Sequence, residues 1–196
     1  MQRHLTILYE LAMSLHRLLA ISFVTLASLA HADSKVTTSY GQAPNGSANV
    51  AGREWLRCSL GQQWNGSTCI GQAKKYTFEG AKAAVDTFNA TGYRGKGDWR
   101  VPTVRELQSL RVCSNGFGST SSYIQGTDKP PVRTSCNSNS SQPTINTALF
   151  PQTPESLFWS SSLYPESSSF AWVVYFGYGL VSHGYVRSSY YVRLVR

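Results

Sequence analysis

Four cysteines restrict the folds open to this 196-residue chain: Cys58, Cys69, Cys113 and Cys136. An even number of cysteines behind an export signal predicts two disulfides, and sequence alone allows three pairings. We favour Cys58–Cys69 and Cys113–Cys136, because each pair encloses a short polar loop rich in Gly, Asn and Ser. Each such closure contributes roughly 3 kcal/mol. A zinc site is the alternative, but the spacing lacks paired C-x-x-C motifs and neighbouring histidines.

Residues 1–32 are predicted to be a signal peptide. His16 and Arg17 precede an apolar run over 18–29, and Ala30-His31-Ala32 supplies a cleavage signature. The apolar run is too short to span a membrane. We therefore expect an exported chain, not membrane-spanning, that acts in the periplasm, at the cell surface or in the medium.

The rest of the chain is expected to form a flexible polar leader over 33–51 and one binding domain over 52–196. Charged residues make up 14% of the chain and the formal net charge is +8. A basic excess attracts nucleic acid, anionic lipid or acidic glycans. The export signal and the lack of any Lys/Arg run argue against nucleic acid. Acidic or sulfated polysaccharide, or simple solubility, remain as interpretations of the charge.

Two helices are predicted to follow the first cysteine pair. Thr77 is a candidate N-cap for the first, and Asn89 and Gly92 are stop signals. The apolar stripe of this helix lies at helical spacing and comprises Phe78, Ala81, Val85 and Phe88. Thr103 and Glu106 match a capping box that opens a second, shorter helix.

Strands are predicted at both ends of the domain. Trp55–Cys58 forms a first strand, and the Asn65-Gly66 pair is a strong hairpin signal. Aromatic and β-branched residues, which suit a pleated surface, predict further strands at 158–161, 170–176 and 189–195.

Residues 113–154 contain no clear element, and a loop of this length is usually functional or stapled. Ile145, Leu149 and Phe150 are expected to pack on the core. Core support is also assigned to Trp99, Leu107, Trp159, Trp172 and Val192.

The segment from Tyr175 to Tyr191 contains no Lys, Glu, Gln, Met or Trp, and its tyrosines alternate with Gly and Ser. Tyrosine offers a large amphipathic contact at low conformational cost, and Ser and Gly add adaptable hydrogen bonding. This composition predicts a recognition surface, with an ordinary Tyr-rich β-ribbon as the equal alternative. Arg187 is expected to hold an anion or carboxylate. The predicted ligand contacts are Tyr175, Gly177, Tyr178, Leu180, Ser182, His183, Tyr185, Arg187, Ser188, Ser189 and Tyr190.

Catalytic motifs are missing from the sequence. There is no nucleophile elbow, P-loop, dinucleotide fingerprint or H-E-x-x-H. His183 is the sole histidine after the signal, and the carboxylates are scattered, so nucleophilic, glycosidase and calcium chemistry lack support. We expect a protein that is not an enzyme and takes no cofactor or metal.

Four motifs, in this order, resemble the bacterial family named for the C-terminal domain of the Legionella collagen-like adhesin. They are Trp55–Gly66, Asp98–Thr103 with Glu106-Leu107, Phe158–Ser162 and Tyr191–Arg196. The resemblance implies an α+β, C-type-lectin-like fold with two helices packed on small twisted antiparallel sheets and with paired terminal strands. It also implies a binding domain for a cell-surface protein or glycan, including sulfated polysaccharide, and allows an oligomer.

Two further expectations follow from the resemblance. Some members look like the variable proteins of diversity-generating retroelements, in which randomised adenines never yield Lys, Glu, Gln, Met or Trp. The segment from Tyr175 to Tyr191 fits that restriction. Related formylglycine-generating oxidases share the broad fold but need reactive cysteines, so this alternative predicts free thiols.

Overall fold

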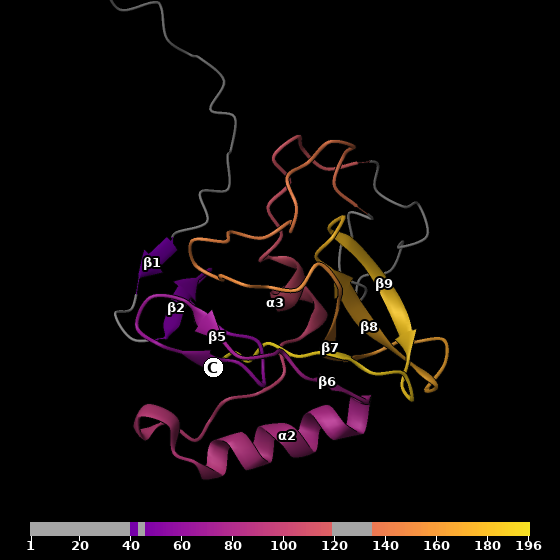
Figure 1. The fold of residues 1–196 in the computed structure, drawn as a ribbon. Coiled ribbons are helices and arrows are strands. Elements are labelled where there is room, and N and C mark those ends of the chain that lie inside the picture. The colour runs from indigo at the N-terminus through magenta and orange to yellow at the C-terminus, as the bar shows by residue number, and fades with distance from the viewer. Residues whose placement is uncertain (1–39, 43–45, 119–134) are drawn as a thin grey trace, which may run out of the picture. The chain divides into compact units, whose positions relative to one another are not determined.

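The computed structural model describes residues 40–42, 46–118 and 135–196 and shows an α+β fold (Figure 1). The predicted signal and most of the predicted leader lie outside these residues. The described elements are β1 (Tyr40–Gln42), β2 (Ser47–Val50), β3 (Arg53–Leu56), β4 (Gln63–Trp64), β5 (Cys69–Ile70), β6 (Lys75–Tyr76), α2 (Phe78–Ala90), the 3₁₀ turn η1 (Tyr93–Gly95), α3 (Val104–Gln108), β7 (Leu157–Leu163), β8 (Phe170–Tyr175), β9 (Leu180–Tyr185) and β10 (Tyr190–Tyr191).

A five-stranded sheet with the order β6-β10-β7-β8-β9 forms the centre of the domain. Strands β7, β8 and β9 pair antiparallel in sequence, whereas β10 runs parallel to β7 and antiparallel to β6. Strand β9 is therefore an edge. Two smaller sheets, β1-β2-β3 and β4-β5, complete the described strands.

The two faces of the central sheet carry separate hydrophobic clusters, because neighbouring residues of a strand point to opposite faces. Trp159 and Val173 pack on one face with Phe78 of helix α2. Phe158 and Val174 pack on the other face with residues of helix α3 and of the β2–β3 hairpin. The core expectations are confirmed: Trp99, Leu107, Ile145, Leu149, Phe150, Trp159, Trp172 and Val192 are all buried.

Both helices begin at the predicted caps. The Thr77 hydroxyl accepts a hydrogen bond from the Gly80 amide at the start of α2. Thr103 and Glu106 form the predicted capping box at the start of α3. Glu106 also accepts two hydrogen bonds from Arg100, at 2.6 and 2.7 Å. The Arg100 hydrogen bonds lower the pKa of Glu106 to about 2, against the opposing effect of burial.

The two ends of the domain pair with each other, as the resemblance implies. The Leu56 amide donates to the Leu194 carbonyl at 3.0 Å, and Glu54 and Arg196 exchange two backbone hydrogen bonds. Between them, Arg193 is fully buried and donates to the Leu56 carbonyl at 2.9 Å and to the Thr153 hydroxyl at 2.7 Å. Burial lowers the pKa of Arg193 to about 9, so the guanidinium stays charged at neutral pH.

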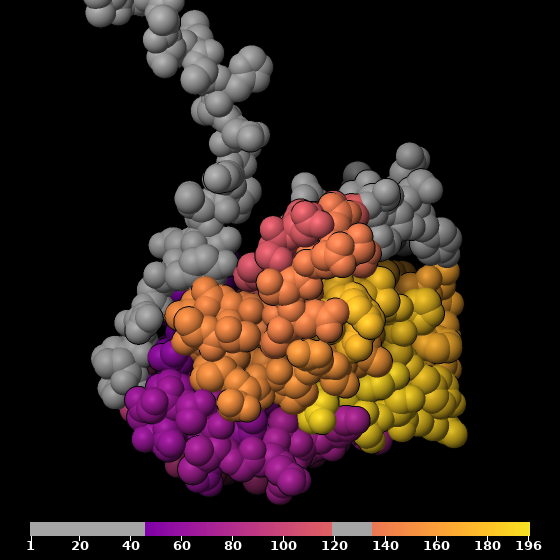
Figure 2. All heavy atoms as spheres, turned by 45° about the horizontal axis from the view of Figure 1, so that its top comes forward, coloured from indigo at the N-terminus to yellow at the C-terminus, as the bar shows by residue number. Residues whose placement is uncertain are grey.

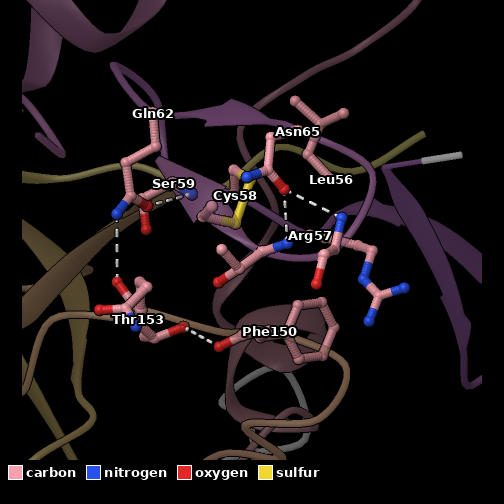
Figure 3. Close-up of a disulfide and its surroundings, with 12 residues drawn as sticks. Leu56, Arg57, Cys58, Ser59, Gln62, Asn65, Phe150 and Thr153 are labelled. Atoms are coloured by element: carbon pink, nitrogen blue, oxygen red, sulfur yellow. Dashed lines mark hydrogen bonds between the residues drawn. A yellow bond between two sulfur atoms is a disulfide. The ribbon is translucent and has the colours of Figure 1, made fainter. Parts of the chain in front are cut away.

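Both predicted disulfides are confirmed. Cys58 is bonded to Cys69, and Figure 3 shows this bridge beside Ser59 and Gln62. Cys113 is bonded to Cys136 across the described ends of the long loop. Paired cysteines are typical of proteins that fold outside the cytoplasm.

The predicted boundary at residue 52 is wrong. Ser47–Val50 forms strand β2, and the side chains of Ala48 and Val50 are fully buried. A four-residue strand with two small apolar residues resembles polar leader in sequence, and its pairing with β3 reveals it. Within the described ranges, no helix is long and apolar enough to cross a membrane.

The strand predictions differ from the structure in two further places. Strand β9 lies inside the segment that we expected to form a recognition surface or a Tyr-rich β-ribbon, and Phe176 and Val181 of that segment are buried. The predicted strand over 189–195 is limited to β10, with Val195 forming isolated bridges to Trp55 and Arg100.

Candidate ligand-binding surface

The backbone carbonyls of the turn between β8 and β9 accept hydrogen bonds from Cys136 and from residues on either side of the second disulfide loop. The Thr144 amide and hydroxyl both donate to the Phe176 carbonyl, at 2.6 and 2.8 Å. The Cys136 amide donates to the Tyr178 carbonyl at 2.9 Å. The Arg111 guanidinium donates to the next carbonyl, that of Gly179. The carbonyls of Phe176, Tyr178 and Gly179 are thus all held by hydrogen bonds.

Two glycines allow this close contact. Gly179 has a φ of +63°, and a Cβ there would collide with the Sγ atom of Cys136. A Cβ at Gly177 would meet the ring of Tyr175. The ring of Tyr175 therefore lies across the turn, where it makes an edge-to-face contact with Tyr178 at 5.3 Å between centroids.

Tyr178 is the most exposed tyrosine of this turn, with 59% of its surface accessible. Tyr175 is half-buried and Gly177 is buried. The turn thus presents one free aromatic ring that is supported by a second ring.

A polar pocket of about 510 Å³ lies beside Tyr178. Its walls come from the turn and from the loop after Cys136, including Asn137, Asn139 and Gln142. Figure 2 shows these two segments side by side on the surface, yellow for the C-terminal residues and orange for the loop. Sequence reasoning did not place the loop residues beside Tyr178. The disulfide that joins the loop to the domain was the available signal.

Hydrogen bonds within the loop fix part of the pocket. The Asn115 side chain donates to the Ser138 carbonyl at 2.8 Å, and the Asn137 side chain donates to the Asn115 carbonyl at 3.0 Å. In the described part of the chain, nothing engages the side-chain amides of Asn139 and Gln142. These two exposed amides remain available to a ligand.

The other predicted contacts are distributed over both faces of strand β9. Leu180 and Ser182 share the face of Trp159, whereas His183 and Tyr185 lie on the opposite face. His183 stacks on Tyr164 at 4.4 Å between ring centroids. The eleven predicted residues do not form one continuous face.

Three of the predicted contacts follow β9 at its far end. Arg187 is exposed and lines a second pocket of about 510 Å³ with Lys82 and Glu79 of helix α2. Ser188 is half-buried and Ser189 is exposed.

Tyr190, another predicted contact, is half-buried and packs against the core. Its ring packs on Trp159 at 4.7 Å between centroids and occupies the space in front of Gly184. The half-buried ring extends the core on the α2 side. A residue in β10, between β6 and β7, has little freedom to face a partner.

The four cysteines of the chain are all engaged in the two disulfides. The free thiols that the oxidase alternative predicts are thus not seen at any of these four described positions.

Comparison with protein families gives a match over most of the chain. No curated protein matches the chain. The family described as the Lcl C-terminal domain matches residues 47–196, beginning at the first residue of β2 and including both disulfides. Because this match covers more than half of the chain, the protein belongs to the Lcl C-terminal domain family.

Proposed function

We propose that the protein is an exported, non-enzymatic binding module with a C-type-lectin-like fold. Its ligand is a cell-surface protein or glycan. The paired domain ends, the two helices and the two disulfides support this fold assignment. The adhesin-associated family and the closed cysteine pairs support binding in preference to oxidase chemistry.

The observation that carries the proposal is an exposed tyrosine on a fixed turn. Tyr178 is presented by a backbone that Thr144, Cys136 and Arg111 hold in place. Aromatic anchors of this kind dominate interface energies. A rigid support reduces the entropy lost on binding. The amides of Asn139 and Gln142 add directional contacts beside the ring.

Sequence variation at this surface is part of the proposal. The composition of Tyr175 to Tyr191 matches the residue set that adenine randomisation allows. An adenine-rich near-copy of the coding DNA beside the gene is the expected companion. Its absence from the flanking DNA would contradict diversification while leaving binding intact.

Two matched tyrosine variants test the proposal. The purified domain, Tyr178→Ser and Tyr185→Ser are each applied to an array of glycans and cell-surface proteins. Tyr178→Ser is expected to weaken captured signals by roughly tenfold or more. It should leave the melting temperature nearly unchanged, because the ring is exposed.

Tyr185→Ser is the control, since Tyr185 is also exposed, at 42%, but lies at the other end of β9. A loss of array binding with Tyr185→Ser alone would place the ligand contact at the Tyr185 end of strand β9. Equal binding by all three proteins would contradict a tyrosine-based site.

Acidic polysaccharide is a second candidate ligand. The net charge of +8 and the exposed Arg187 favour it; Arg187 shares its pocket with Lys82, which forms an ion pair with Glu79 at 2.9 Å. Binding of this kind weakens steeply with salt, because the charges are exposed and screened. Retention on a heparin column that does not depend on salt would exclude it.

A further inference from the structure

A third pocket lies between the β4–β5 hairpin and the C-terminal end of helix α2. It has a volume of about 470 Å³, within the usual range of small-molecule sites, roughly 300–1,000 Å³. Trp64, Phe88 and Tyr93 contribute aromatic rings to its walls. None of the eleven predicted contacts lines it.

The chemistry of the walls is aromatic and uncharged. None of the twelve described residues that line the pocket is Asp, Glu, Lys, Arg or His. Besides the three rings, the walls offer amides and hydroxyls, from Gln62, Gln63, Ser59 and Thr91. The walls themselves present no opposite charge to an ionic ligand, and the nearby Arg57 guanidinium is engaged by the Trp64 ring and two backbone carbonyls. A neutral polar ligand with an apolar face matches both the amides and the rings of the walls.

The rings are held in place. The guanidinium of Arg57 lies 4.2 Å from the ring centroid of Trp64, and Arg57 itself donates to the Leu149 carbonyl at 3.0 Å. Trp64 pairs with Cys69, whose disulfide closes the hairpin onto the domain. Tyr93 packs on Phe88 at 5.3 Å between centroids.

Hydrogen-bonding side chains remain available in this pocket. The Gln62 side-chain amide is already used. It accepts a hydrogen bond from the Ser59 backbone amide at 3.2 Å (Figure 3), and it donates one to the Gln152 carbonyl, also at 3.2 Å. In contrast, the Gln63 amide and the Tyr93 hydroxyl have no hydrogen-bond partner among the residues that the structure describes.

The wall backbone is engaged internally. The Leu60 amide donates to the Val192 carbonyl, and the Leu60 carbonyl accepts from the Lys74 amide. The Gly46 carbonyl accepts from the Arg57 amide. A peptide that binds by strand addition needs free backbone groups. This pocket therefore favours recognition through side chains and ring faces.

We propose that this pocket binds a neutral saccharide unit. The C–H face of the sugar packs on Trp64 and Tyr93, and its hydroxyls bond to the Gln63 amide and the Tyr93 hydroxyl. The site is independent of the β8–β9 turn and of any acidic polysaccharide site.

Tryptophan fluorescence gives a direct test. The chain has five tryptophans, and Trp55, Trp99, Trp159 and Trp172 are buried, so Trp64 is the only one open to a ligand. The full domain is titrated with maltotriose, cellotriose and tri-N-acetylchitotriose at low and at high salt. At least one of them should give a saturable change in emission that salt does not alter, because no charge takes part.

Two variants connect the signal to the pocket. Tyr93→Phe removes only a hydroxyl and should weaken binding by about three- to tenfold. Tyr178→Ser should bind the sugar as the wild type does, which separates this site from the proposed contact turn.

Several results would overturn the proposal. One is no saturable change with any of the three sugars. Another is a response only to acidic oligosaccharides that high salt removes. Equal affinity of Tyr93→Phe and wild type, or a response to neutral tripeptides instead, would also contradict it.

Discussion

The two disulfides are chemically the same bond in two different surroundings. Cys58–Cys69 has both cysteines buried and joins the hairpin to the strands that close the domain. Cys113–Cys136 has one half-buried cysteine, and its Cys136 sulfur touches the β8–β9 turn. The first supports an aromatic pocket beside the core, and the second supports an amide-lined pocket beside Tyr178. Each disulfide thus supports a pocket of different chemistry.

The largest loss of stability is expected next to the Cys58–Cys69 disulfide. Arg193→Met removes a buried cation that donates to carbonyls of Leu56 and Arg57 on the approach to Cys58. Their loss leaves buried acceptors without a partner and should lower the free energy of unfolding by about 3 to 5 kcal/mol. Urea denaturation measures this. Arg187→Met, at an exposed arginine, is the control and should change stability by less than about 0.5 kcal/mol.

Removing each disulfide in turn separates the two surroundings. Cys58→Ser/Cys69→Ser and Cys113→Ser/Cys136→Ser should each lose about 3 kcal/mol in urea denaturation, since their loops span 11 and 23 residues. Only the first should reduce the fluorescence response to sugar. Only the second should reduce array binding through Tyr178. The same binding losses in both variants would contradict the assignment of one pocket to each bridge.

Acid titration should report on a region that contains neither bridge. The folded-state pKa of Glu106, about 2, lies below its ordinary value of 4.5. The contribution of the ionised Glu106 carboxylate to folding stability is therefore complete above pH 4.5 and is lost as the pH falls towards 2. Glu106→Gln should remove about 2 kcal/mol at neutral pH. It should also flatten the pH dependence of the melting temperature in that window. A slope unchanged from wild type would show that other carboxylates dominate.

The smallest change in stability is expected for alanine substitutions at two glycines. They separate the cost of a clash with Cys136 from the cost of a left-handed backbone. Gly179 and Gly92 have φ values of +63° and +58°, but only Gly179 lies against another residue. Gly92→Ala should lose about 1 kcal/mol from left-handed strain alone. Gly179→Ala should lose about 1 kcal/mol more and weaken array binding. Equal losses of stability in the two variants would mean that the β8–β9 turn can move away from Cys136 without further cost.

The features that the sequence predicted correctly are local ones. Thr77 and Thr103 cap their helices because each cap depends on residues within one turn. The cysteine pairing followed from short loops, and the burial of Trp159 followed from a strand rich in aromatic residues. These signals need no knowledge of distant contacts.

The distribution of the contacts could not be predicted in the same way. Strand β9 is an edge strand with Gly, Ser and His, so its composition resembles a loop, and its pairing with β8 is decided by tertiary structure. Tyr190 lies in the same polar stretch yet packs on Trp159. The aromatic pocket joins Trp64 to Tyr93 across a helix, a proximity that no short pattern contains.

The turn that carries Tyr178 is held by hydrogen bonds to the main-chain oxygens of Phe176, Tyr178 and Gly179. Every residue has a backbone carbonyl, so these hydrogen bonds do not depend on which side chain is present at position 178. A substitution at position 178 should therefore leave these hydrogen bonds, and with them the path of the turn, unchanged.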